Sequence, residues 1–171
     1  PPPRSTLPVV TNKKTKPSSS NTTNDYAFYG IDIETNVDDR QQNPDAMNDQ
    51  AVQLYVKNLA TNKSSGVIWS KPPDFDSLSN RSTNVMVPLG VANRDSKINA
   101  LNEAIRSASD WGVAFDQVKD FVMKDSNGRK VVFIAWNGNG YDFPLMEIEC
   151  IRHSLESTVS TFVDYYLDAM R

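Results

Sequence analysis

A run of five apolar residues, Val131–Ala135, stops at the turn-forming sequence Trp136–Gly140, and an acid, Asp142, follows two residues later. A continuous apolar run of this length is typical of a strand buried on both faces. The Asn and Gly residues after it predict a tight turn. Beyond the turn, apolar residues recur at helical spacing, which predicts a helix over Phe143–Leu155. The stretch therefore predicts a central strand that turns directly into a helix, with Asp142 at the mouth of that helix.

Two further acids, Asp32 and Glu34, lie in an upstream segment whose aromatic and β-branched residues predict a strand over Tyr26–Ile33. Residues two apart on a strand point to the same face. Burying such carboxylates costs several kcal/mol, on the order of the stability of a fold, unless something pairs them. Three acids from two such places suggest a cation site. The alternatives are that Asp32 and Glu34 face water on an edge strand, and that Asp142 caps its helix.

The other segments predict a mixed sheet flanked by helices, and no internal repeat is found. Strands are predicted over Ala51–Leu59, from Val67 to Trp69 and over Val159–Val163, and helices over Lys97–Trp111, Phe115–Met123 and Asp164–Arg171. The aromatic side chains of Trp69, Trp111 and Phe121 are predicted to lie in the core. This order of elements, β-β-β-α-α-β-α-β-α, indicates an α/β fold.

Composition bounds the class of protein. The 171 residues suffice for one domain, which we expect over 26–171, after a polar and disordered tail over 1–25. No apolar run approaches the roughly 20 residues of a membrane helix. The single cysteine, Cys150, excludes an internal disulfide and is compatible with an intracellular location, nuclear or cytoplasmic. A net charge of −3 argues against a protein that coats DNA electrostatically.

The two acid-bearing stretches together resemble the DEDD superfamily of 3′-to-5′ exonucleases, which have the ribonuclease-H-like fold. The run Gly30–Thr35 resembles the first motif of the superfamily, Asp-x-Glu. The run Asn137–Leu145 is most similar to the second motif of the three-prime repair exonuclease branch. The resemblance extends from Tyr26 over most of the chain. It implies a metal-dependent 3′-to-5′ exonuclease that hydrolyses phosphodiesters with two metal ions.

The resemblance also implies roles for individual residues. It assigns Asp32, Glu34 and Asp142 as the catalytic acids that hold two Mg²⁺ or Mn²⁺ ions. It places substrate-binding residues near the terminal nucleotide, namely Thr35, Asn36, Asn137 and Tyr141, although Asn137 could equally serve only to close the turn. The implied partner is single-stranded or 3′-terminal DNA or RNA. No membrane partner is expected, and a homodimer is left open.

The sequence departs from the superfamily at the third motif, which supplies a fourth acid and a general base. The only histidine, His153, has Thr158 five residues later where that motif needs an acid, and Tyr165 and Tyr166 have the wrong spacing to Asp168. Trp136 stands where close relatives place a histidine. We therefore expect a domain that lacks its C-terminal helices and is slow or inactive alone. The alternatives are that another chain supplies the missing acid, or that the domain is a degenerate nuclease fold that binds nucleic acid or protein.

Overall fold

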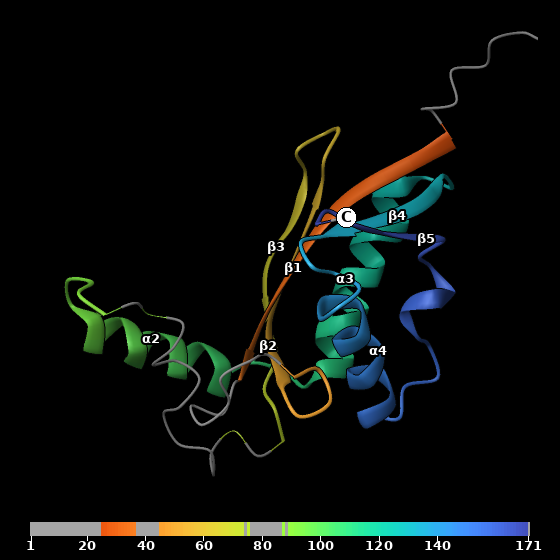
Figure 1. Cartoon of the computed structure of the whole chain (residues 1–171). Coiled ribbons are helices and arrows are strands. Elements are labelled where there is room, and N and C mark those ends of the chain that lie inside the picture. The colour runs from red at the N-terminus through yellow and green to blue at the C-terminus, as the bar shows by residue number, and fades with distance from the viewer. Residues whose placement is uncertain (1–24, 37–44, 74, 76–86, 88, 171) are drawn as a thin grey trace, which may run out of the picture.

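The computed structural model describes residues 25–36, 45–73, 75, 87 and 89–170, and these contain one five-stranded sheet of order β3-β2-β1-β4-β5 (Figure 1). The strands are β1 (Tyr26–Asn36), β2 (Gln50–Asn58), β3 (Ser64–Trp69), β4 (Lys130–Ala135) and β5 (Tyr165–Asp168). β2 runs antiparallel to both β1 and β3, whereas β4 runs parallel to β1 and β5 runs parallel to β4. The predicted α/β class and the mixed sheet are thus confirmed.

The helices are α2 (Arg94–Arg106), α3 (Trp111–Ser126) and α4 (Asp142–Arg152). α3 contacts β2, β3 and β4, and α4 packs beside α3 against β2, so both cover one face of the sheet (Figure 1). α2 stands apart on the β3 side, where its Ile105 packs with Val52 and Phe75. None of the helices in the described ranges is long and apolar enough to cross a membrane.

The main core lies between the sheet and the two helices α3 and α4. Its largest fully buried side chains include Trp111, Tyr29, Phe115, Phe133 and Leu54. Trp111 is therefore a core residue as predicted, and Trp69 and Phe121 are partly buried against the core clusters. Cys150 is also fully buried, with a free thiol whose pKa burial raises to about 11.

The C-terminal part of the predicted element order is wrong. The segment predicted as a strand, Val159–Val163, contains a 3-10 turn, η2 (Val159–Thr161), and the segment predicted as a helix forms β5. Hydroxyl groups explain the turn, because Thr161 Oγ1 donates to the carbonyl of Thr158 at 2.7 Å. Such local side-chain bonds offer the backbone an alternative to a strand ladder. The predicted tail over 1–25 lies, except for Asp25, outside the described residues.

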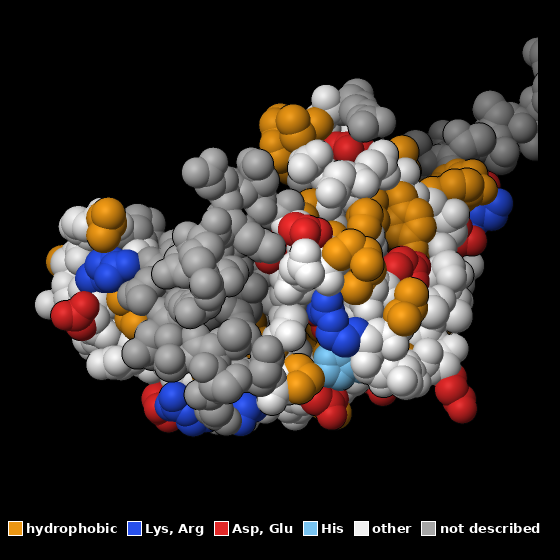
Figure 2. Space-filling model, turned by 60° about the horizontal axis from the view of Figure 1, so that its bottom comes forward, with side chains coloured by type: hydrophobic (Ala, Val, Ile, Leu, Met, Phe, Trp, Pro, Cys, Tyr) orange, Lys and Arg blue, Asp and Glu red, His pale blue; other side chains and the backbone are white. Residues whose placement is uncertain are grey.

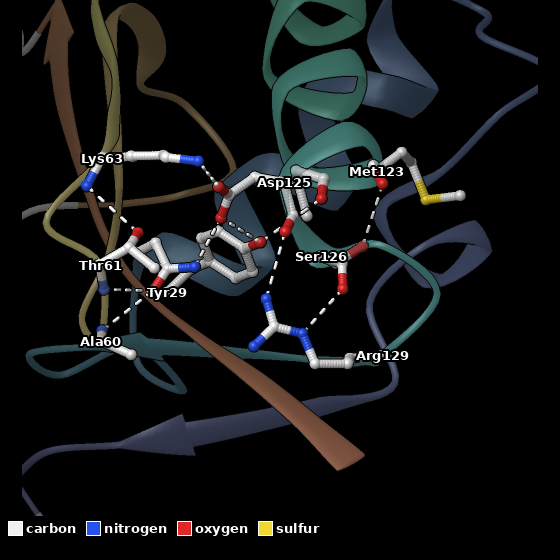
Figure 3. A network of polar contacts seen from close by, with 10 residues as sticks. Tyr29, Ala60, Thr61, Lys63, Met123, Asp125, Ser126 and Arg129 are labelled. Carbon is white, nitrogen blue, oxygen red and sulfur yellow. Dashed lines mark hydrogen bonds and ion pairs between the residues drawn. The ribbon is translucent and has the colours of Figure 1, made fainter. Parts of the chain in front are cut away.

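A buried carboxylate fastens the N-terminal half of β1 to the end of α3 (Figure 3). Asp125 Oδ2 accepts from Tyr29 Oη at 3.0 Å and from Asn58 Nδ2 at 2.5 Å, and Lys63 Nζ lies 3.5 Å from Oδ1. Burial alone would raise the pKa of Asp125, but the hydrogen bonds from Asn58, Tyr29 and Lys63 hold it below its usual value. Arg129 closes the same corner by donating to the carbonyls of Asp125 and Ser126. The strand that bears Asp32 and Glu34 is therefore anchored at its start.

Candidate functional site

β1 presents Asp32 and Glu34 on the face opposite the core. Ile31, Ile33 and Thr35 alternate with them and are buried, while the two acids are exposed. β1 lies between β2 and β4 in the sheet, so it is not an edge strand, but both acids are exposed as that alternative expected. The backbone of β1 at the two acids pairs with β2, whereas its ladder with β4 ends at Gly30.

Asp142 lies at the start of α4, just after the turn that follows β4, as the sequence predicted. The ladder between β1 and β4 runs from Tyr26↔Lys130 to Gly30↔Ile134, so the end of β4 lies beside the middle of β1. The helix α4 begins at Asp142 itself, and its N-cap position is held by Tyr141, whose side chain makes no capping bond. Asp142 is thus the first helical residue, and the alternative that it merely caps the helix is wrong.

The turn between β4 and α4 depends on small and left-handed residues. Asn137 has a φ of 56°, and its carbonyl accepts from Gly140 N at 3.0 Å and from Tyr141 N at 3.1 Å. A Cβ atom on Gly138 would come within 2.5 Å of the Phe143 ring, and one on Gly140 within 2.6 Å of Asn137 Oδ1. Asn137 therefore closes the turn, and both glycines allow the turn to pack closely before Asp142.

The acids influence one another electrostatically. Burial, and then the charges of Asp32 and Asp168, raise the pKa of Asp142 to about 6, although hydrogen bonds from the backbone N–H groups of Asp142 and Ile33 oppose the shift. The Asp142 side chain is 8% exposed. Glu34 has an exposed side chain, yet enough protein surrounds its carboxyl group that partial desolvation and then the charge of Asp32 raise its pKa. Asp32 thus acts on both other predicted acids.

Two further acids reach this region that sequence reasoning did not assign to it. Asp168 ends β5 opposite Ala135, and its Oδ2 accepts from Asn139 N at 3.3 Å. It was missed because its segment was predicted as a helix. Asp49 lies just before β2 and is 1% exposed. Asp49 carries no local sequence signal, because its partner Tyr141 is 92 residues away.

The predicted substrate-binding residues are partly brought together. Thr35 Oγ1 lies 2.7 Å from Tyr141 Oη, and Tyr141 Oη donates to Asp49 Oδ2 at 2.7 Å. Burial, reinforced by Asp49, raises the pKa of Tyr141, so the phenol is protonated at neutral pH. Asn36 is the last residue of β1, and its side chain lies outside the described part of the structure.

His153 lies at the other end of α4 from Asp142. The two residues are eleven positions apart along the helix, which corresponds to roughly 16 Å. His153 follows the last helical residue, with Nε2 3.4 Å from Glu149 Oε2. Burial lowers the pKa of His153, so the ring is neutral at pH 7. This position is remote from the predicted acids.

The carboxylates of Asp32, Glu34 and Asp142 are suitable ligands for a hard divalent cation, but they are not arranged as a complete coordination site. Carboxylate oxygens are the ligands that Mg²⁺ and Mn²⁺ prefer. Within the described ranges, however, no group of three His, Cys, Asp or Glu side chains lies close enough together to hold an ion. Asp32 and Glu34 are exposed and can change rotamer, whereas Asp142 is buried. The site thus has suitable donor chemistry, one fixed acid and two adjustable ones.

Charges elsewhere are dispersed. On the face shown in Figure 2, the Lys and Arg side chains of the described residues alternate with acidic and hydrophobic ones. This distribution agrees with the net charge of −3. The described residues on this face therefore form no broad basic surface of the kind that binds nucleic acid mainly by charge.

Comparison with solved structures identifies the fold. No protein-family profile matches the chain, and no curated protein sequence matches it. One similar structure is that of exonuclease I, whose description says that it suggests how processivity is achieved. The similarity covers 84% of this chain and 28% of exonuclease I, at 12% identity and a TM-score of 0.54. E. coli exonuclease I in complex with a dT13 oligonucleotide matches over the same shares at 12% identity and a TM-score of 0.51.

The nuclease domain of 3′hExo, a DEDDh family member bound to rAMP, is similar over 76% of this chain and 60% of its own, at 12% identity and a TM-score of 0.50. The chain therefore has the ribonuclease-H-like fold of these exonucleases. It spans little more than a quarter of the length of exonuclease I. At these identities the likeness concerns the fold, and the three-prime repair exonuclease branch stays a prediction.

Proposed function

We propose that this chain is the acid-bearing part of a metal-dependent exonuclease that hydrolyses nucleic acid from the 3′ end. The observation that carries the proposal is the approach of Asp142, from the end of β4, to the acid pair of β1. The charge of Asp32 raises the pKa of both Asp142 and Glu34. This approach occurs in a fold shared with exonuclease I and with the 3′hExo nuclease domain.

We assign Asp32, Glu34 and Asp142 as the residues that hold two Mg²⁺ or Mn²⁺ ions. When bound, such cations activate water and neutralise charge on the phosphate. Asp142 must lose its proton to become a ligand, so its pKa of about 6 implies weaker cation binding below that pH. Thr35, Asn36, Asn137 and Tyr141 then lie next to the terminal nucleotide. The implied partner is single-stranded or 3′-terminal DNA or RNA, and a homodimer and an intracellular location remain predictions.

A second candidate function is a nuclease fold that binds nucleic acid or protein without cutting. The observation that favours it is the lack of a three-ligand group among the described residues. The two candidates differ in cation binding, because a pure binding module does not need the three acids. They also differ in what a substitution of Asp32 should change.

The direct test is Mn²⁺ binding measured by calorimetry, followed by a digestion assay. We expect saturable binding that is lost in the double variant Asp32→Ala, Asp142→Ala and kept in Asp116→Ala, which removes an exposed acid from α3. Equal binding by the parent and the double variant would refute the cation site. This measurement does not require the chain to be active alone.

The digestion assay uses single strands labelled at the 5′ end, incubated with Mg²⁺. Removal of nucleotides from the 3′ end gives a ladder of shortened labelled products, whereas removal from the 5′ end releases the label at once. Replacing Asp32 by Ala should slow digestion on the order of a thousandfold, because several kcal/mol of charge stabilisation are lost. Digestion undiminished in Asp32→Ala would contradict the assignment. Robust digestion by this chain would contradict our expectation that it is slow alone.

A further inference from the structure

Asp49, Tyr141 and Thr35 form a buried chain of hydrogen bonds next to the proposed site. Asp49 Oδ2 accepts from Tyr141 Oη at 2.7 Å, and it also accepts from Asp45 N at 2.8 Å. A tyrosine hydroxyl has one proton, so Tyr141 cannot donate to Thr35 as well. Thr35 must therefore donate to Tyr141 across the 2.7 Å contact between their oxygens. Asp49 thus sets the direction of the whole chain of bonds.

This chain of bonds spans a place where β1 still pairs with β2 but no longer pairs with β4. The ladder between β1 and β4 ends at Gly30↔Ile134, and the register of β1 with β2 shifts between Glu34 and Thr35. Beyond the ladder, the end of β1 is joined to the start of α4 by side chains. Thr35 directly follows Glu34, and Tyr141 directly precedes Asp142. The Thr35–Tyr141 bond therefore links the backbone beside one acid to the backbone beside the other.

Asp49 is itself held firmly by the last turn of α4. Arg152 Nη1 donates to the carbonyl of Asp49 at 3.1 Å, and Nη2 donates to the carbonyl of Met47 at 3.1 Å. The same guanidinium forms an ion pair with the buried carboxylate of Glu149, whose Oε1 accepts from Ala51 N. The segment that carries Asp49 is therefore fixed against α4 independently of Tyr141.

Packing alone does not account for a carboxylate at position 49. Asp49 is 1% exposed, and its Oδ1 is buried without a hydrogen-bond partner. A buried polar atom left unsatisfied lowers stability by roughly 1–3 kcal/mol. A smaller or apolar side chain would avoid that loss, so the acid is explained by its other oxygen, Oδ2, which accepts both from Asp45 N and from Tyr141 Oη.

We propose that Asp49 is a positioning residue of the acidic site. By accepting from Tyr141, it holds the Tyr141–Thr35 bond and so fixes the spacing between the end of β1 and the start of α4. The proposal rests on the proposed function insofar as Glu34 and Asp142 bind a cation together. It assigns a role to a residue outside the two acid-bearing stretches.

The test compares variants by Mn²⁺ calorimetry on the whole chain. Asp49→Ala and Tyr141→Phe should each weaken Mn²⁺ binding on the order of tenfold, the size expected when a partner behind a metal ligand is lost. The double variant should bind no more weakly than the worse single one, because both break the same chain. Asp49→Asn keeps an acceptor oxygen and should restore most of the affinity. Tyr166→Phe, a partly buried tyrosine outside this chain of bonds, is the matched control.

Amide hydrogen exchange separates this proposal from the proposed function. In Asp49→Ala, the amides of Thr35 and Asp142 should exchange faster, while that of the core residue Phe133 should not. Unchanged exchange, or unchanged Mn²⁺ affinity in a protein whose Asp32→Ala variant has lost it, would overturn the positioning role. If the parent binds no Mn²⁺ at all, the proposed function fails, and the exchange result alone decides whether Asp49 holds the two segments.

Discussion

Replacing Asp142 by Asn should stabilise the protein at neutral pH, because the folded state holds this carboxylate in an unfavourable place. Burial and then the charges of Asp32 and Asp168 raise its pKa from 3.8 to about 6. A folded-state pKa above the unfolded value means that the folded protein binds the proton more tightly. The free energy of unfolding therefore falls as the pH rises from about 4 to about 6, and stays low above that.

The magnitude follows from the shift. One pKa unit corresponds to about 1.4 kcal/mol, so a shift of about two units makes ionised Asp142 unfavourable by about 3 kcal/mol. For a domain of this size, 1 kcal/mol moves the melting temperature by roughly 2–4 °C. Asp142→Asn should therefore raise the melting temperature at pH 7.5 by roughly 6–12 °C on these figures. At pH 4, where the parent is protonated, the difference should nearly vanish.

Thermal unfolding followed by circular dichroism between pH 4 and pH 7.5 measures this effect. Asp116→Asn, which neutralises an exposed acid on α3, controls for net charge and should change little. Mn²⁺ at pH 7.5 should stabilise the parent more than Asp142→Asn, because the cation offsets the charge that the variant lacks. A variant that melts at or below the temperature of the parent at pH 7.5 would refute the reasoning.

Three further predictions concern the fold. Gly138→Ala should destabilise the chain by about 1–3 kcal/mol, because the new Cβ would overlap the Phe143 ring. A urea titration measures the free energy of unfolding. Gly112→Ala is the comparison, and it should lower this free energy by clearly less, because its new Cβ would lie 3.2 Å from the nearest atom. Asp125→Asn should lower the free energy of unfolding by about 1–3 kcal/mol at pH 7, because it weakens the hydrogen bonds that Asp125 accepts from Tyr29 and Asn58. Because the folded-state pKa of Asp125 is lowered, this difference should shrink as the pH falls below about 4, the unfolded value, and equal stability at pH 7 would contradict it. Deleting residues 1–24 should leave the melting temperature within a few degrees, given their polar composition, and a larger drop would show that they dock on the domain.

Much of the fold could be predicted because its signals are local. The apolar run Val131–Ala135 has the composition of a strand buried on both sides, and the structure places β4 inside the sheet. The alternation of acids with Ile31 and Ile33 fixed which face of β1 would bear them, since side chains alternate on any strand. The Asn and Gly residues after Ala135 fixed the turn, and so placed Asp142 at the start of α4.

The C-terminal segment could not be predicted in the same way. Val159–Val163 has the composition of a strand, yet hydroxyl bonds among Thr158, Ser160 and Thr161 favour a 3-10 turn. β5 has only four residues, too few to show a period clearly, and it forms because β4 offers a free edge. Asp168 therefore reaches Asn139 through sheet pairing that no local pattern records.

The carboxylates near the two ends of β1 have opposite pKa shifts, and this difference bears on where the functional site lies. At its start, Asp125 receives bonds from Tyr29 and Asn58, and these keep its pKa low. At its far end, Asp142 is held with a raised pKa, and Asp49 keeps one oxygen without a partner. A sequence selected for stability alone would satisfy or remove such groups, and locally costly arrangements in natural proteins cluster at functional sites. The stable corner around Asp125 anchors the strand whose other end carries the unfavourable charges. A divalent cation would relieve those charges, and the imbalance therefore supports the cation site that we propose at the far end of β1.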